Sequence, residues 1–265
     1  MPVSNTYANR PGGKPLGPTA WFQVQPNSVA HMRLFCFPYA GGGAAIYHPW
    51  MKRSPSHIEV VPVLLPGREL RVKEPAFTRF ELMIEVLTRE IVPYLDKPFA
   101  FFGHSMGAIL SFELARSLRA ERRVEPEHLF ISGRRSPRSP RVDPYIHDLP
   151  DREFVAEIER MNGTPQEVLE HTELMELLIP MLRGDFAVCY TYSYVPGEPL
   201  RCPMTVLGGT RDETTPREQL DAWRAETTGD FHVHLLEGDH FFINQQPDKI
   251  LSIIQRALPP RPEFR

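Results

Sequence analysis

The chain has 265 residues, of which 42% are hydrophobic and 24% are charged, and its formal net charge at pH 7 is −3. This length and composition are typical of a globular protein of one or two domains, and they exclude a disordered chain, a collagen and a coiled coil. Because the chain has no excess of basic residues, we expect binding neither to nucleic acid nor to a membrane surface.

Targeting and cross-linking signals are weak. No apolar run is long enough to cross a membrane, and the first residues lack the apolar stretch of a signal peptide. The three cysteines (Cys36, Cys189 and Cys202) are odd in number and form no Cys-x-x-Cys pair, so we expect neither a disulfide framework nor a metal site. These features predict a cytoplasmic protein, and we expect a monomer.

Residues 1–30 contain five prolines and are predicted to form a flexible N-terminal tail, with Trp21 and Phe22 as possible anchors. From residue 31 onward, short apolar runs alternate with segments of helical periodicity. Strands are predicted over 32–37, 58–65, 99–102, 128–132, 204–209 and 232–238, and helices over 44–53, 80–94, 108–118, 217–225 and 248–257.

The alternation is interrupted between residues 151 and 185, where two or more amphipathic helices rich in Leu and Met are predicted. We therefore expect an α/β core over residues 31–148 and 186–260 and a helical lid insertion over residues 149–185. Strands that are apolar throughout predict a mostly parallel sheet with helices on both faces. Such sheets bind their ligands at the carboxyl ends of the strands.

The strongest chemical signal is the sequence Gly103-His104-Ser105-Met106-Gly107, which follows a predicted strand and precedes a predicted helix. This is the setting of a nucleophile elbow, in which a strained serine exposes its hydroxyl at a helix N-terminus. Ser105 is therefore the predicted nucleophile. A plain glycine–serine turn is the alternative interpretation.

A serine nucleophile needs a base and an acid, and Ser…Asp…His is the chain order that accompanies such an elbow. Asp212 and His240 each follow a predicted strand, so we expect His240 to be the base and Asp212 to orient it. Asp239 and Asp185 are the second and third candidates for the acid. The other histidines considered are less favourably placed on the strands, in the helical block or beside the nucleophile: His104, His147, His171, His232 and His234.

A second glycine-rich loop, PYAGGGAA, follows the first strand. It lacks the Gly-Lys-Ser/Thr of a P-loop, and Ile46 stands where a dinucleotide fingerprint needs its third small residue. In a hydrolase this loop supplies one backbone N–H of the oxyanion hole, and the residue after the nucleophile supplies the other. We therefore predict that the amides of Ala40 and Met106 form the oxyanion hole. A flexible turn is the alternative.

Seven blocks of the sequence resemble, in order, the type II thioesterases, stand-alone α/β-hydrolases that accompany polyketide synthases and nonribosomal peptide synthetases. The blocks are LFCFPYAGGGAAIYHPW, LLPGRELR, FAFFGHSMGA, LFISGRRSP, LRGDFAVCYTY, CPMTVLGGTRDE and EGDHFFI, within residues 32–257. The family often has His where this chain has Tyr39, a departure that leaves the predicted triad unchanged.

The resemblance implies an α/β-hydrolase fold with a helical lid, and a triad of Ser105, Asp212 and His240. It also implies that acyl groups are hydrolysed from the phosphopantetheine thiol of acyl or peptidyl carrier proteins through an acyl-serine intermediate, and that stalled assembly lines are edited in this way. The carrier protein is then the partner, and the enzyme needs no cofactor of its own. A general carboxylesterase, a product-releasing or cyclising thioesterase, and a non-catalytic binding protein are the alternatives.

Three further expectations concern the surroundings of the site. Basic residues between Arg134 and Arg141 could steer an acidic carrier protein, or they could belong to a solvated loop. Arg68 is expected to be structural, paired with Glu69 or with a backbone carbonyl. Apolar residues of the helical block are expected mostly to pack the lid, while some could line an acyl chamber: Phe154, Ile158, Met161, Leu169, Leu174, Leu178 and Met181.

Overall fold

The structure is a computed structural model that describes residues 20–24, 27–140, 145–164 and 166–260. Most of the predicted N-terminal tail therefore lies outside the described residues. Within the described part of the tail, the side chains of Trp21 and Phe22 are buried, and Phe22 forms an antiparallel bridge with Val63.

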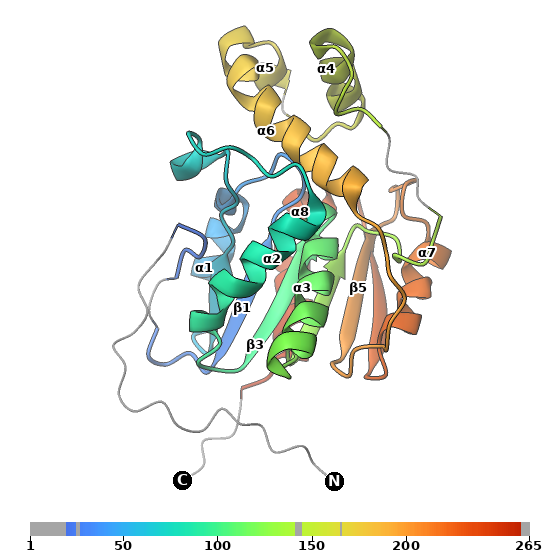
Figure 1. The fold of residues 1–265 in the computed structure, drawn as a ribbon. Helices are drawn as coiled ribbons and strands as arrows, with labels where there is room; N and C mark the ends of the chain where they lie inside the picture. The colour runs from blue at the N-terminus through green and yellow to red at the C-terminus, as the bar shows by residue number, and fades with distance from the viewer. Residues whose placement is uncertain (1–19, 25–26, 141–144, 165, 261–265) are drawn as a thin grey trace.

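A six-stranded sheet forms the centre of the molecule (Figure 1). All neighbouring strands are parallel, in the order β2-β1-β3-β4-β5-β6. The strands are β1 (Met32–Phe37), β2 (Ile58–Pro62), β3 (Phe99–His104), β4 (His128–Ser132), β5 (Met204–Gly209) and β6 (Phe231–Leu236). The predicted α/β class with a mostly parallel sheet is confirmed.

Helices cover both faces of the sheet because successive strand residues point to opposite sides. Phe35 and Phe37 of β1 pack in one apolar cluster with α2 and α3, whereas Leu34 and Cys36 pack in another with α1 and α9. The helices of the core are α1 (His48–Arg53), α2 (Phe80–Ile91), α3 (Met106–Arg122), α7 (Arg217–Asp221), α8 (Phe242–Gln245) and α9 (Pro247–Ala257). Short 3-10 turns are η1 (Ala44–Tyr47), η2 (Glu69–Arg71), η3 (Val92–Tyr94) and η4 (Ala222–Glu226).

Three helices lie between β4 and β5 in the sequence: α4 (Asp151–Arg160), α5 (Gln166–Leu169) and α6 (Thr172–Thr191). They gather beyond one end of the sheet (Figure 1), and buried side chains such as Phe154, Ile158 and Met175 form a small apolar cluster there. The boundary predicted for the lid, residue 185, falls inside α6. The division of the chain into core and lid stays a prediction.

Three predicted strands differ in their bounds from those observed. The strand predicted over 232–238 begins one residue earlier, at Phe231, and ends at Leu236. The strand predicted over 58–65 ends at Pro62, because Val63 pairs with Phe22 and the Leu64 amide donates to the Trp21 carbonyl. The strand predicted over 99–102 continues to His104, whose neighbour across the sheet is Ser132. The short helix α8 has no counterpart among the predicted elements.

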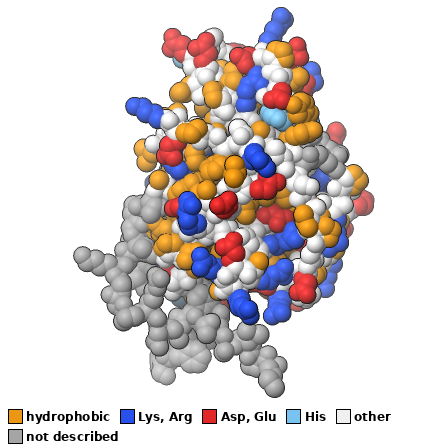
Figure 2. All heavy atoms as spheres, in the orientation of Figure 1, with side chains coloured by type: hydrophobic (Ala, Val, Ile, Leu, Met, Phe, Trp, Pro, Cys, Tyr) orange, Lys and Arg blue, Asp and Glu red, His pale blue; other side chains and the backbone are white. Residues whose placement is uncertain are grey.

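The surface is mixed in charge. Acidic and basic side chains are interspersed over the face seen in Figure 2, as the small net charge leads one to expect. Among the helices of the described residues, none combines the length and the apolar character that crossing a bilayer requires.

Candidate active site

Ser105 occupies a tight turn between the last residue of β3 and the first residue of α3. Its φ is 53° and its ψ is −111°, a backbone conformation that non-glycine residues rarely adopt. The Ser105 amide donates a 2.8 Å hydrogen bond to the carbonyl of Ser132 on β4, which holds the turn against the sheet. The strained turn leaves the side chain partly exposed at the N-terminus of α3.

The two glycines that flank the turn allow the backbone to approach itself. A Cβ on Gly103 would overlap the carbonyl of Gly107, and a Cβ on Gly107 would overlap the carbonyl of Phe37 on β1. Any other residue at either position would push the turn away from the sheet. The tight turn at Ser105 therefore requires glycine at both flanking positions.

The structure brings Ser105, His240 and Asp212 together, although they come from three different loops. The distance from Ser105 Oγ to His240 Nε2 is 3.1 Å, and that from His240 Nδ1 to Asp212 Oδ2 is 2.7 Å. Asp212 lies three residues after β5, and His240 lies four residues after β6. Each loop follows the carboxyl end of a parallel strand, and this common position explains the meeting.

Asp212 is held by its own turn. Its Oδ1 accepts hydrogen bonds from the amide and the hydroxyl of Thr214, at 3.0 and 2.6 Å, and its Oδ2 accepts one from the Thr215 hydroxyl at 2.7 Å. Burial by itself would raise the pKa of the Asp212 carboxyl, but His240 and the two threonines outweigh burial and hold this pKa well below its usual range. The carboxyl of Asp212 is therefore ionised at neutral pH.

The competing acids and bases have other contacts. Asp239 accepts a hydrogen bond from the Phe241 amide, and His171 accepts one at the start of α6 from the Leu174 amide. His104 is fully buried, with Nδ1 2.8 Å from Ser132 Oγ, and burial holds its pKa well below the usual range.

The two amides predicted for the oxyanion hole flank the nucleophile. Ala40 lines the same cavity as Ser105, and Met106 is the first residue of α3. Within the described ranges we find no acceptor for either amide. Their assignment to an oxyanion stays a prediction, but both donors are available for a ligand.

A buried ion pair that the sequence did not predict fixes the loop that carries Ala40. Arg68 donates to both carboxylate oxygens of Asp185, at 2.7 and 2.8 Å. Asp185 Oδ2 also accepts from the Gly41 amide at 2.7 Å, and Arg68 donates to the Gly42 carbonyl at 2.7 Å. The pair thus joins α6 to the glycine-rich loop directly beside Ala40.

This pair corrects the predicted partner of Arg68. Glu69, the predicted partner, instead accepts a 2.9 Å hydrogen bond from the Ala45 amide. The predicted contact of Arg68 with backbone carbonyls is observed, at Gly42 and Pro66. Asp185 lies 117 residues from Arg68, so only the folded chain brings the two together. Asp185 is accordingly engaged away from His240.

The cavity above Ser105 has a volume of about 490 Å³. Its apolar lining comes from three regions, namely Met161 after α4, Phe186 on α6 and Phe241. Charged side chains also line it, among them Arg160, Arg211 and Glu213. Of the helical-block residues considered in the sequence, Met161 reaches this cavity. By contrast, Phe154, Ile158 and Met181 pack in the apolar cluster of that block.

Tyr39 of the glycine-rich loop lies against two aromatic rings. Its ring centroid is 5.7 Å from that of His104 and 5.1 Å from that of Phe241. It also lines the cavity above Ser105. A phenol ring therefore forms part of the wall of this cavity.

The basic stretch after β4 is partly engaged. Arg135 donates to the carbonyl of Thr214, two residues after Asp212, at 2.7 Å, and Arg138 donates to Glu226 at 2.6 Å. Arg141 lies outside the described residues. Whether this stretch steers a carrier protein stays a prediction.

Comparisons with known proteins agree on one family. A model of the thioesterase domain matches residues 32–258. The gramicidin S biosynthesis protein GrsT of Aneurinibacillus migulanus is 44% identical over 239 residues, which cover 90% of this chain and 93% of GrsT. The protein named linear gramicidin dehydrogenase LgrE of Brevibacillus parabrevis is 44% identical over 247 residues, which cover 92% of this chain and 94% of LgrE.

A solved structure shares the fold. The type II thioesterase BorB from the borrelidin biosynthetic cluster superposes with a TM-score of 0.81 at 34% sequence identity, and the match covers 92% of this chain and 100% of BorB. The α/β-hydrolase fold inferred from the sequence resemblance is thereby confirmed.

The close approach at the elbow predicts the effect of one added methyl group. We expect Gly107→Ala to lower the free energy of unfolding by about 1–3 kcal/mol, because the Phe37 carbonyl cannot move without disturbing β1. Urea unfolding measures the change. Gly197→Ala is the matched control, since its Cβ would meet only the movable end of Arg116. Equal stability of the two variants would contradict the steric account.

The lowered pKa of Asp212 predicts how stability changes with pH. A carboxyl whose folded pKa lies below its unfolded pKa adds stability above the unfolded value, and this stability is lost as the pH falls toward the folded value. Asn cannot titrate, so the gap in unfolding free energy between the wild type and Asp212→Asn should narrow from pH 7 to pH 3. If this difference in unfolding free energy stayed constant or grew between pH 7 and pH 3, the pKa of Asp212 would not be lowered in the folded protein.

The buried ion pair predicts strong coupling between α6 and the glycine-rich loop. Asp185→Leu leaves the Arg68 guanidinium buried without its carboxylate, so we expect a loss of about 3–5 kcal/mol in unfolding free energy. In the double variant Arg68→Met with Asp185→Leu no charge is left buried, and part of this loss should be recovered. Chemical denaturation of the wild type, Asp185→Leu, Arg68→Met and the double variant gives the coupling energy of the pair. If the losses of the two single variants add up to that of the double variant, the two residues are not coupled.

Proposed function

The chain belongs to the thioesterase domain family and is a thioester hydrolase, and from this premise we propose that it removes acyl groups from the phosphopantetheine thiol of carrier proteins. Ser105, His240 and Asp212 are proposed to act as a catalytic triad. The observation that carries the proposal is the 3.1 Å distance between Ser105 Oγ and His240 Nε2, together with the 2.7 Å contact from His240 Nδ1 to Asp212.

Acylation is the first half of the proposed reaction. Ser105 Oγ attacks the carbonyl carbon of the thioester while its proton passes to His240 Nε2. The carbonyl oxygen becomes an oxyanion, which the amides of Ala40 and Met106 would stabilise together with the N-terminus of α3. The carbon–sulfur bond then breaks, and the sulfur leaves as a thiol with the proton from His240.

Deacylation repeats the same steps with water. His240 takes a proton from a water molecule, which attacks the ester carbonyl of acyl-Ser105. The carbon–oxygen bond to Ser105 breaks, Ser105 Oγ recovers the proton, and the free acid leaves. Asp212 keeps the imidazole in one tautomer and stabilises the imidazolium in both halves. Its low pKa suits this role, because the carboxylate stays ionised throughout.

Two kinds of support favour a carrier-bound substrate from an antibiotic assembly line. GrsT is named for gramicidin S biosynthesis, and BorB is named a type II thioesterase of a biosynthetic cluster. The apolar cavity around Met161 and Phe186 suits a hydrocarbon chain beside Ser105. The editing of stalled polyketide or peptide synthases is the role that this combination favours.

The name of LgrE contains a dehydrogenase activity, which we do not extend to this chain. The glycine-rich loop that could bind a dinucleotide has Ile46 where the fingerprint requires a small residue. The same loop is held by Asp185 and Arg68 through Gly41 and Gly42. Ala40 of this loop lines the same cavity as Ser105.

The proposed function is tested by intact-mass analysis of carrier proteins loaded with different acyl groups. We expect the acyl mass to be lost and the free acid to appear. We expect Ser105→Ala to reduce the rate by about 10⁴-fold or more, because it removes the nucleophile. Matched oxygen esters provide the comparison, and equal rates on both would instead favour a general esterase. A cyclised product would favour a releasing thioesterase, and wild-type protein unlabelled by a fluorophosphonate would favour a binding protein.

A further inference from the structure

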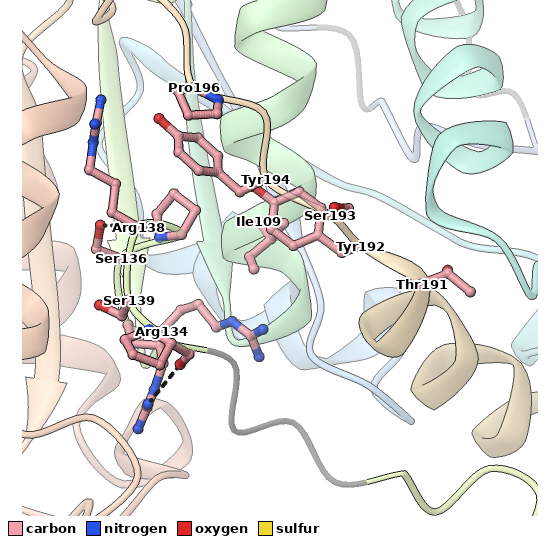
Figure 3. Close-up of a pocket in the computed structure, with 13 residues that line it drawn as sticks. Ile109, Arg134, Ser136, Arg138, Ser139, Thr191, Tyr192, Ser193, Tyr194 and Pro196 are labelled. Atoms are coloured by element: carbon pink, nitrogen blue, oxygen red, sulfur yellow. Dashed lines mark hydrogen bonds between the residues drawn. The ribbon is translucent and has the colours of Figure 1, made fainter.

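A second cavity adjoins the one that contains Ser105. It has a volume of about 540 Å³ and lies between the loop after β4 and the segment after α6 (Figure 3). Arg134 and Arg135 line both cavities. Ile109 of α3, four residues after Ser105, forms another part of its wall. The second cavity therefore begins close to the nucleophile.

The walls of the two cavities differ in chemistry. The cavity above Ser105 has charged side chains in its wall, but it also has a group of large apolar ones, Met161, Phe186 and Phe241. In the second cavity, side chains from the loop after β4 face side chains from the segment after α6 (Figure 3), and most of them carry a polar group. Its hydroxyl groups belong to Ser136, Ser139, Thr191, Tyr192, Ser193 and Tyr194.

Acidic side chains behind this wall are neutralised. Glu226 is buried and accepts hydrogen bonds from Arg138 at 2.6 Å and from the Tyr194 hydroxyl at 3.0 Å. Glu113 likewise accepts from the Tyr192 hydroxyl at 2.7 Å and from Arg116 at 2.9 Å. The two tyrosines on the wall are fixed in this way. Arg134, Arg135 and Arg138 also line this cavity. Hydroxyl and guanidinium groups are hydrogen-bond donors, which suits the carbonyl oxygens of amides.

A thioester substrate has two halves that diverge from the reacting carbon, and the two cavities adjoin each other at Arg134 and Arg135, with Ser105 in the wall of one of them. We propose that the second cavity binds the amide-bearing half of the substrate, while the cavity above Ser105 takes the hydrocarbon half. This inference rests on the proposed function. Two sources supply such a chain: the pantetheine arm, with two amides and hydroxyl groups, and a peptidyl group on the carbonyl side. Both would donate and accept hydrogen bonds along the wall.

A bulky side chain at Ser193 tests the inference, because this exposed residue lines only the second cavity. The probes are hexanoyl-N-acetylcysteamine, hexanoyl-pantetheine and a dipeptidyl-N-acetylcysteamine. For Ser193→Trp we expect kcat/KM to fall by about tenfold or more on one of the two longer probes, relative to hexanoyl-N-acetylcysteamine. Val195→Trp is the control, since Val195 is exposed on the same segment and lies outside the cavity lining.

Each outcome decides a separate question. A selective loss on hexanoyl-pantetheine assigns the cavity to the carrier arm, and a selective loss on the dipeptidyl probe assigns it to the acyl side. Unchanged ratios among the three probes, or the same ratios in Val195→Trp, would overturn the inference while the wild type still hydrolyses them. If the wild type hydrolyses none of these probes and no loaded carrier protein, the proposed function itself fails.

Discussion

The geometry of the candidate site depends on one close approach of the backbone to itself. The turn at Ser105 lies so near β1 that Gly107 touches the Phe37 carbonyl, and Gly103 touches the carbonyl of Gly107. Only side chains of a single hydrogen fit there. This contact holds the Ser105 hydroxyl at the carboxyl edge of the sheet, where the loops after β5 and β6 also end. The 3.1 Å distance to His240 follows from that shared edge.

The sequence was sufficient wherever the signal is local. Strands β1, β4 and β5 were predicted with their observed bounds, because apolar runs flanked by turn residues define a buried strand. The three residues proposed as a triad could be selected because the elbow motif is contiguous and the parallel topology brings loop residues to one edge. Asp212 is also held by local contacts, since Thr214 and Thr215 donate hydrogen bonds to its carboxylate.

Contacts between residues far apart in the sequence could not be predicted from the sequence in this way. Nothing near Arg68 in the sequence indicates that its partner lies on α6, and its charged neighbour Glu69 suggested the wrong pair. The bridge between Phe22 and Val63 that ends β2 was missed for the same reason. The second cavity likewise arises from the loop after β4 and a segment more than fifty residues away. Periodicity and motifs describe neighbours along the chain, whereas these features depend on neighbours in space.

The ion pair between Asp185 and Arg68 anchors only the C-terminal half of α6, the part that follows Pro180. After Pro180 the helix is largely buried, and Gly184 lies close against Ala76, whereas before Pro180 half of the residues are exposed and Met175 alone is buried. Proline has no N–H to bond with the Glu176 carbonyl, so the helix is weakest at this point. Any swing of α4, α5 and the first turns of α6 would therefore pivot at Pro180. The anchored half would stay in place, and the amide of Ala40 would keep its position beside the nucleophile.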